Sequence, residues 1–164
     1  MDKFHEQLLR TKKSPKYKLL GVAMYFSIFV ACLYGLLSSR GIAMMIIAVI
    51  FAAGSFALKI FRDKQYKEYE YIFTNGNLQI DVIFNKRKRK TLYDVDTKNF
   101  DNFGKSSEIN VAKGVKLVYC YPWDDKNEQY VILLSGNGKQ AVYITPNEEL
   151  LKLMRVFNIR RPRA

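Results

Sequence analysis

The chain has 164 residues, of which 27 are Lys or Arg and 15 are Asp or Glu, so its formal net charge is +12. This length favours one soluble domain together with any membrane segments. The two cysteines, Cys32 and Cys120, lie far apart and have neither disulfide-scaffold nor metal-site spacing. The single histidine, His5, has no Cys, His or carboxylate neighbours at ligand spacing, which argues against a metal centre.

The excess of positive charge is densest in the first part of the chain. The first 65 residues contain 10 basic and 3 acidic residues, a net charge of +7, whereas residues 66–164 contain 17 and 12, a net charge of +5. Because this charge flanks apolar segments, it indicates a membrane lipid surface before it indicates nucleic acid. Residues 66–164 contain no recognised nucleic-acid-binding motif, so we expect no nucleic-acid partner.

Two uncharged apolar segments lie near the N-terminus. Residues 19–37 are 19 residues without a charge, and residues 41–58 add 18 more. A helix of that length rises about 28 Å, close to the bilayer hydrocarbon thickness of about 30 Å. Lys59 can extend its side chain toward the interface, so we place a two-helix transmembrane hairpin at residues 19–61. A cleaved signal peptide would have a shorter apolar core, and buried helices would need a larger protein around them.

The charged flanks predict the orientation of this hairpin. Six basic residues precede the first segment, four follow the second, and the short connection holds only Arg40. The positive-inside rule therefore places both termini in the cytoplasm and the protein in the cytoplasmic membrane. Residues 1–18 form a basic N-terminal arm, in which residues 2–13 are either a short helix or a solvated segment. Ser14 and Pro15 are a suitable N-cap and first residue for the first long helix.

A stripe of small residues follows one face of the first membrane helix. Small residues at this spacing let a second helix approach closely, either within the hairpin, in a second copy of the chain or in another membrane protein. No charged residue lies within either span, which disfavours a transporter. The stripe consists of Ala23, Ser27, Ala31 and Gly35.

Residues 66–164 carry the signals of an α+β domain. Residues 68–74 and 77–84 alternate in polarity around Asn75-Gly76, the strongest short hairpin signal. A reversal at residues 85–90 follows. Further strands are predicted at 91–96, 97–103, 115–121, 129–135 and 140–145, with a polar loop at 104–114. Thr145 or Asn147 then caps a helix whose inner face holds Leu150, Met154 and Phe157.

The predicted element count has a known precedent. About seven antiparallel strands and one C-terminal helix match the pleckstrin-homology-like (PH-like) plan, a bent sheet with a helix closing one end. The same count also suits other small antiparallel sheets closed by a helix. The count therefore predicts the α+β class and leaves the PH-like fold as its leading form.

Three segments carry a resemblance to a family: YEYIFTNGNLQIDVIFNKRKRKTLYDVD, CYPWDD and VYITPNEELLKLM. With the two-helix hairpin in front of them, the chain resembles small uncharacterised membrane proteins of Gram-positive bacteria, grouped as a domain of unknown function. The likeness covers nearly the whole chain. The soluble part is similar to bacterial PH-like domains found beside membrane helices. The resemblance implies this architecture and brings no activity or site with it.

Two features of the soluble part are candidates for binding. The basic run can meet anionic lipid headgroups or a partner, or it can be a solvated turn that keeps a sheet edge soluble. Trp123, in a polar turn, can anchor a partner or pack across the end of the sheet. In related eukaryotic domains the first hairpin loop often binds inositides, but here that loop is the short, uncharged Asn75-Gly76. The basic run is Lys86, Arg87, Lys88, Arg89 and Lys90.

These observations favour a non-enzymatic, membrane-tethered interaction module at the inner face of the cytoplasmic membrane. It would bind a protein partner, an anionic lipid surface or both. The alternative is a structural subunit of a larger membrane complex, assembled through the hairpin, and a homo-oligomer is possible. We expect no enzymatic activity and no cofactor, because no catalytic constellation is apparent in the sequence.

Overall fold

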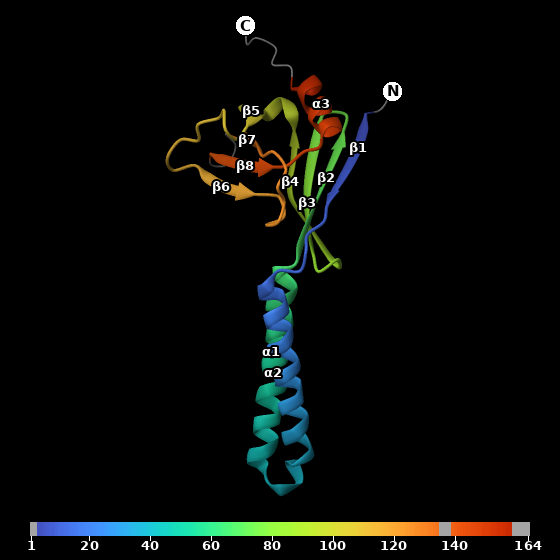
Figure 1. Cartoon of the computed structure of the whole chain (residues 1–164), viewed down its shortest axis with the longest axis vertical. Helices are drawn as coiled ribbons and strands as arrows, with labels where there is room; N and C mark the ends of the chain where they lie inside the picture. The colour runs from blue at the N-terminus through green and yellow to red at the C-terminus, as the bar shows by residue number, and fades with distance from the viewer. Residues whose placement is uncertain (1–2, 135–138, 159–164) are drawn as a thin grey trace. The chain divides into compact units, whose positions relative to one another are not determined.

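The computed structural model describes residues 3–134 and 139–158. The chain forms two compact units, which are shown in Figure 1. Residues 12–66 make up the helical unit. The strand-rich unit combines the residues up to Thr11 with those from Lys67 onward.

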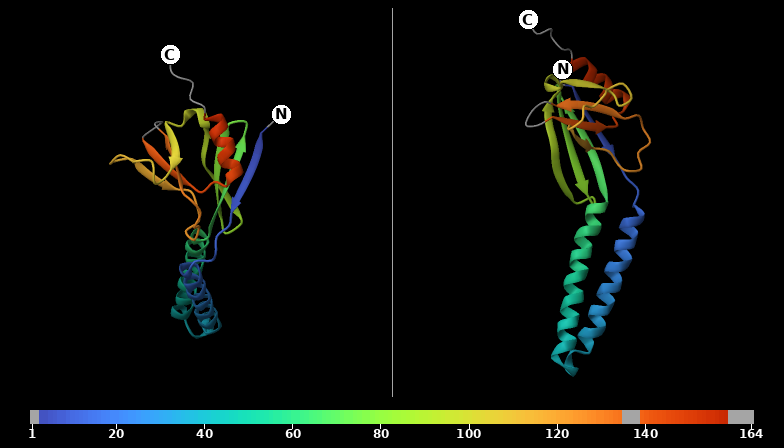
Figure 2. Two further views of the ribbon diagram at one scale, coloured as in Figure 1. Left: turned by 45° about the horizontal axis from the view of Figure 1, so that its top comes forward. Right: turned by 90° about the vertical axis from the view of Figure 1, so that its left-hand side faces the viewer.

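The helical unit is a hairpin of two long apolar helices. Helix α1 (Pro15–Leu36) and helix α2 (Ile42–Gln65) are joined through a 3-10 turn, η1 (Ser38–Arg40), and lie side by side (Figure 2). The Tyr17 N–H donates to Ser14 Oγ at 3.2 Å, so Ser14 is the N-cap of α1. Both helices are long and apolar enough to cross a membrane, by length and composition. The two predicted apolar helices are confirmed; α1 begins at Pro15, before its uncharged segment, and α2 ends at Gln65, after its own.

The first sheet of the strand-rich unit has the order β1-β2-β3-β4 and is antiparallel throughout. Asn75 and Gly76 join β2 to β3 with positive φ angles of 51° and 97°, the conformation that a two-residue hairpin turn needs. A Cβ atom at Gly76 would also lie 2.9 Å from the Phe157 ring. Glycine is therefore required at this position for two reasons, the positive φ angle and the lack of space. The strands are β1 (Phe4–Leu9), β2 (Lys67–Thr74), β3 (Asn77–Phe84) and β4 (Lys88–Asp96).

Strand β1 corrects the prediction for the N-terminal arm. Neither a short helix nor a solvated segment forms, because Phe4–Leu9 pairs with β2 from Phe4 opposite Thr74 to Leu9 opposite Tyr69. A helix of this length is marginal in water by itself, whereas pairing satisfies the backbone groups at the edge of β2. The segment also alternates with period two, since Leu9 is buried in the core while Phe4 is exposed.

The second sheet has the order β5-β7-β8-β6, and it departs from the predicted all-antiparallel plan because β6 runs parallel to β8. The predicted strand at 97–103 begins instead as a 3-10 turn, η2 (Thr97–Asn99), which the Asp96 carboxylate caps. Residue 135, the end of one predicted strand, lies outside the described residues. The strands are β5 (Asn102–Lys105), β6 (Lys116–Tyr119), β7 (Tyr130–Leu134) and β8 (Gln140–Ile144).

Helix α3 (Glu148–Phe157) closes the core at one end of the two sheets (Figures 1 and 2). Asn147 Oδ1 accepts from the Leu150 N–H at 2.8 Å, so Asn147, one of the two residues predicted as candidates, is the N-cap. Leu150 and Met154 are fully buried, and the Phe157 ring lies 5.5 Å from that of Phe73. The core therefore depends on contacts among both sheets and the helix.

A polar network, buried at Tyr71 and exposed at Asn147, links β1 and β2 to the segment that follows β8. The Tyr71 hydroxyl donates to the Cys120 carbonyl at 2.6 Å and accepts from the Thr145 N–H at 3.2 Å. Gln7 Nε2 donates to the Thr145 carbonyl at 3.0 Å, and its Oε1 accepts from the Asn147 N–H at 2.8 Å. Burial raises the pKa of Tyr71, which therefore remains a neutral donor in this network.

Candidate functional site

The basic run occupies the turn between β3 and β4 and the first residues of β4. The Arg87 N–H donates to the Phe84 carbonyl at 3.0 Å, and the two central residues, Asn85 and Lys86, have φ angles of 47° and 57°. A lysine seldom adopts this left-handed conformation, so the flanking strand pairs, which begin with Phe84 opposite Lys88, must hold the turn. All five side chains of the basic run are exposed.

This turn lies at a defined end of the first sheet. Lys67, the first residue of β2, is opposite Phe84, and Leu9, the last residue of β1, is opposite Tyr69. Thr11 and Lys67 are the residues through which the chain passes between the two units. The basic run is therefore at the end of the strand-rich unit that carries both chain connections.

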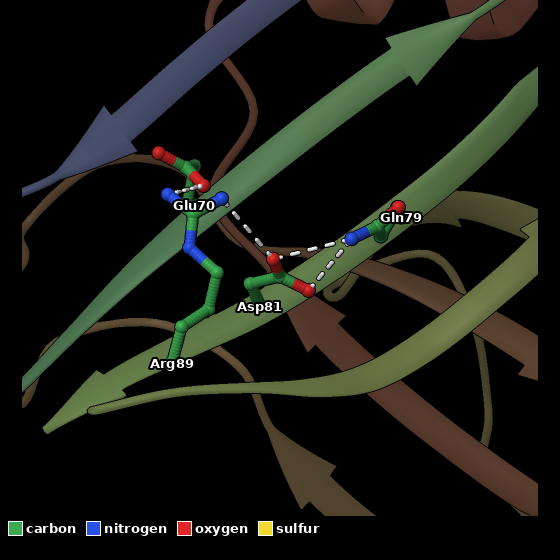
Figure 3. Close-up of polar contacts among 4 residues, drawn as sticks. All are labelled: Glu70, Gln79, Asp81 and Arg89. Carbon is green, nitrogen blue, oxygen red and sulfur yellow. Dashed lines mark hydrogen bonds and ion pairs between the residues drawn. The ribbon is translucent and has the colours of Figure 1, made fainter.

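Arg89 differs from the other members of the basic run because it pairs with buried carboxylates (Figure 3). Its Nη2 lies 2.7 Å from Glu70 Oε2, and its Nη1 lies 3.7 Å from Asp81 Oδ2. The side chains of Glu70 and Asp81 are only 5% and 1% exposed, while that of Arg89 is 54% exposed. Gln79 Nε2 donates to both oxygens of Asp81, at 3.0 and 3.2 Å.

A β-bulge in β4 places Arg89 over these carboxylates. The pairing register of β3 with β4 shifts between Ile80 and Asp81, so that Arg89 is opposite Ile83. Without the shift Arg89 would be opposite Phe84, whose face of β3 packs on the core. A one-residue slip moves a side chain to the other face of a sheet. The bulge is therefore the reason that Arg89 lies on the same face as Glu70 and Asp81.

The charge balance of this cluster affects Glu70 most. Burial raises the pKa of Glu70, and the nearby carboxylates of Glu6 and Asp81 raise it further, while the positive charge of Arg89 lowers it. Glu70 and Asp81 are directly opposite each other on β2 and β3, an arrangement that is destabilising for like charges. Arg89 thus offsets a repulsion built into the β2–β3 hairpin, and part of the basic run is structural.

Sequence reasoning missed this cluster, although one signal for it was present. The two-residue turn at Asn75-Gly76 determines the register of β2 and β3, and that register makes Glu70 and Asp81 opposite neighbours. Two carboxylates on one face predict a nearby cation. Which cation it would be depended on the bulge in β4, which no local signal marks.

Trp123 is exposed instead of packing across the end of the sheet. Its side chain is 62% exposed, and it lies in the turn that follows β6. The Thr11 hydroxyl donates to Asp124 Oδ1 at 2.7 Å, and the Thr145 hydroxyl donates to Asp125 Oδ2 at 2.6 Å. The backbone on the C-terminal side of Trp123 is therefore held to the segments that follow β1 and β8.

In the small-residue stripe of the hairpin, Ser27 packs within the helical unit. Ser27 is buried, and its Oγ donates to the Phe51 carbonyl of α2 at 2.8 Å. A Cβ atom on Gly54 would lie at an ordinary contact distance, 3.7 Å, from Ser27 Oγ, so Gly54 of α2 faces Ser27 of α1. Ala23 is half-buried on the same helix.

The two C-terminal members of the stripe have a different environment from Ser27. Ala31 and Gly35 line an open groove of about 460 Å³ between the helices, opposite Ala48, Ala52 and Ser55 of α2. The stripe is thus divided between residues that pack inside the hairpin and residues that leave a groove.

Groups suited to metal binding or thiol chemistry are scarce in the described residues. Among residues 3–134 and 139–158, no group of three or more His, Cys, Asp or Glu side chains could hold a metal ion. Burial raises the pKa of Cys120 to about 12, so this thiol remains protonated at neutral pH. The candidates for binding among the described residues are therefore the charged and aromatic surfaces.

Comparison with known proteins identifies the family. Residues 1–162 match the family described as a bacterial PH-like domain (DUF6106). The chain belongs to this family. The match confirms the predicted PH-like fold, and we now call the strand-rich unit the PH-like domain. No curated protein and no solved structure matches the chain.

Proposed function

We propose that this protein is a membrane-tethered, non-enzymatic interaction module at the inner face of the cytoplasmic membrane. In this proposal α1 and α2 span the bilayer, both termini are cytoplasmic, and the PH-like domain binds anionic lipid, a protein partner or both. The lipid version makes the sharper prediction, because it assigns a named surface, the basic run, to a ligand of known charge.

The exposed apolar surface of the helices supports the tether. Leu19, Leu36 and Ile42 are 70%, 84% and 73% exposed, and none of the apolar window of α2 is buried. Core helices of a soluble protein would be mostly buried, whereas lipid tails solvate such side chains as well as another protein would. The basic residues that flank the hairpin favour cytoplasmic ends.

The position and charge of the basic run carry the lipid proposal. In sequence, only Tyr66 separates α2 from β2, and the first residue of β2 is opposite Phe84 at the basic turn. In this proposal, the short connection to a membrane helix brings that end to the headgroups. Each lysine or arginine near an anionic surface contributes about 1 kcal/mol. Because Arg89 is engaged by Glu70 and Asp81, four residues supply the contact: Lys86, Arg87, Lys88 and Lys90.

Hydrogen exchange of the full chain in nanodiscs tests this proposal. We expect residues 84–90 to exchange more slowly in anionic nanodiscs than in zwitterionic ones. Replacing Lys86, Arg87, Lys88 and Lys90 by Gln should remove this difference, because no charge would remain to hold the turn at the headgroups. Added salt should weaken the protection in the wild type.

A variant with the same charge change elsewhere provides the matched control. Lys98, Lys113, Lys152 and Arg155 are also exposed, and replacing them by Gln lowers the net charge equally. Lipid-dependent protection of residues 84–90 should persist in this control. Equal protection in both nanodisc types for the wild type would contradict lipid binding by the basic run.

The groove in the hairpin favours a second candidate function, a structural subunit of a membrane complex. Small residues on both helices line it, and such surfaces permit close helix packing. Replacing Ala31 and Ala52 by Leu would fill the groove without altering Ser27. A smaller assembly in detergent would support this function, and an unchanged assembly size would count against it.

A further inference from the structure

Trp123 is presented by a fixed turn. The Asp125 N–H donates to the Pro122 carbonyl at 3.1 Å, which closes the turn around Trp123. The carboxylates of Asp124 and Asp125 accept from the hydroxyls of Thr11 and Thr145 at 2.7 and 2.6 Å. These bonds hold the turn to the segments that follow β1 and β8. They also direct both negative charges toward the domain.

The turn lies at the same end of the PH-like domain as the basic run. Thr11, which binds Asp124, is the last residue of the domain before the chain enters the helical unit. The basic run is at the end of the first sheet where β1 finishes and β2 begins. One end of the domain therefore presents both a tryptophan and a group of cations.

Tyrosines at and just after the end of β6, close to Trp123 in sequence, cluster with Tyr143 of β8. The Tyr119 ring stacks on Tyr143 with 4.9 Å between centroids, and it meets Tyr121 edge-on at 6.0 Å. Tyr119 is 52% exposed and Trp123 is 62% exposed. Trp and Tyr prefer the layer between lipid tails and water, where the ring is buried and the polar atom stays hydrated.

We propose that Trp123 anchors the PH-like domain in the interfacial layer of an anionic bilayer, beside the headgroups that the basic run contacts. This inference rests on the proposed function, which brings this end of the domain to the membrane. It adds that binding is not electrostatic alone. The basic run supplies attraction that salt weakens, and the indole supplies apolar contact that salt does not screen.

Trp123 is the single tryptophan of the chain, so its fluorescence reports this contact directly. The full-length protein is reconstituted at one chain per nanodisc, with lipids brominated at upper or at deep acyl positions. In anionic nanodiscs we expect a blue-shifted emission and strong quenching by the upper bromines, with weak quenching by the deep ones. High salt should reduce the quenching only in part.

A relocated tryptophan supplies the matched control. Phe4 is 62% exposed, as Trp123 is, but it lies opposite Thr74 at the other end of the β1–β2 ladder. The double variant Trp123→Phe, Phe4→Trp should show red-shifted emission that brominated lipid leaves unquenched. Circular dichroism checks that both forms are folded, which the exposure of both sites favours.

The outcomes separate the anchor from the proposed function. Unquenched Trp123 with lipid-dependent protection of residues 84–90 would overturn the anchor and leave lipid binding by the basic run intact. Loss of both signals would overturn both. Blue-shifted emission without bromine quenching would mean that protein, and not lipid, covers Trp123, which also overturns the anchor. Equal quenching in the relocated variant would show that contact with lipid is non-specific, and it would also overturn the anchor.

Discussion

The two units of this protein treat the same kinds of side chain in opposite ways. In the PH-like domain Phe73 and Leu150 are 0% exposed, whereas in the helical unit Phe56 and Leu19 are 65% and 70% exposed. A domain in water must bury its apolar residues to offset the entropy of folding, but helices in lipid gain little from doing so. This contrast in exposure is what the proposed membrane tether requires, and matched substitutions in the two units test it.

A matched pair of phenylalanine substitutions should have the largest effect. Phe73→Ala removes a fully buried ring and should lower the free energy of unfolding of the PH-like domain by about 3–5 kcal/mol. Phe56→Ala removes an exposed ring from α2 and should leave that free energy within about 0.5 kcal/mol of the wild type. Denaturant unfolding in nanodiscs, followed by near-ultraviolet circular dichroism, measures both. Similar losses in the two variants would mean that the units do not differ in this way.

A second pair of substitutions tests the division within the basic run. Arg89→Met leaves the buried Glu70 and Asp81 without their cation and should destabilise the PH-like domain by about 2 kcal/mol, since Arg89 is itself half exposed. Arg87→Met makes the same charge change at the exposed turn and should stay within about 0.5 kcal/mol. For binding to anionic lipid the order should reverse, with Arg87→Met the more harmful. Equal stability of the two variants would contradict a structural role for Arg89.

The smallest effect should be a pH dependence at Glu70. Burial raises the pKa of Glu70 above its ordinary value of 4.5, so the folded state binds this proton at a higher pH than the unfolded state. Ionised Glu70 therefore weakens folding at neutral pH, and this cost falls as the pH drops through the folded-state pKa. We expect Glu70→Gln to be slightly more stable than the wild type at pH 7. Unfolding curves from pH 7 down to 4.5 should show the difference shrinking, and a growing difference would contradict this assignment.

The elements that the sequence predicted well are those with local signals. The charge-free segments predict the long helices, Asn75-Gly76 predicts the β2–β3 hairpin with its register, and Asn147 with the acidic residues after it predicts the start of α3. Each signal acts over a few residues of one element. For the candidate site, the sequence predicted the basic run and Trp123 as candidates, but it did not predict which residues they contact.

The elements that sequence reasoning missed depend on contacts between distant segments. Strand β1 pairs with β2, although the whole helical hairpin separates these strands in sequence. Strand β6 pairs in parallel with β8, and β7 lies between them in sequence. The polarity of six residues at the N-terminus is compatible with a helix or a strand, and only the open edge of β2 decides between them.

By itself, then, the sequence determined the two apolar helices and the α+β class of the domain, because periodicity, turn chemistry and capping are local. The opposition of Glu70 and Asp81 follows from the Asn75-Gly76 turn, but it was not predicted. Only the tertiary structure decided which cation of the basic run offsets those carboxylates, because a bulge in β4 turns Arg89 to their face. It also decided that Trp123 and the basic run share one end of the domain, because Thr11 and Asp124, far apart in sequence, meet there. Both features depend on strand pairing and hydrogen bonds between distant segments, and no local sequence signal in either segment predicts those contacts.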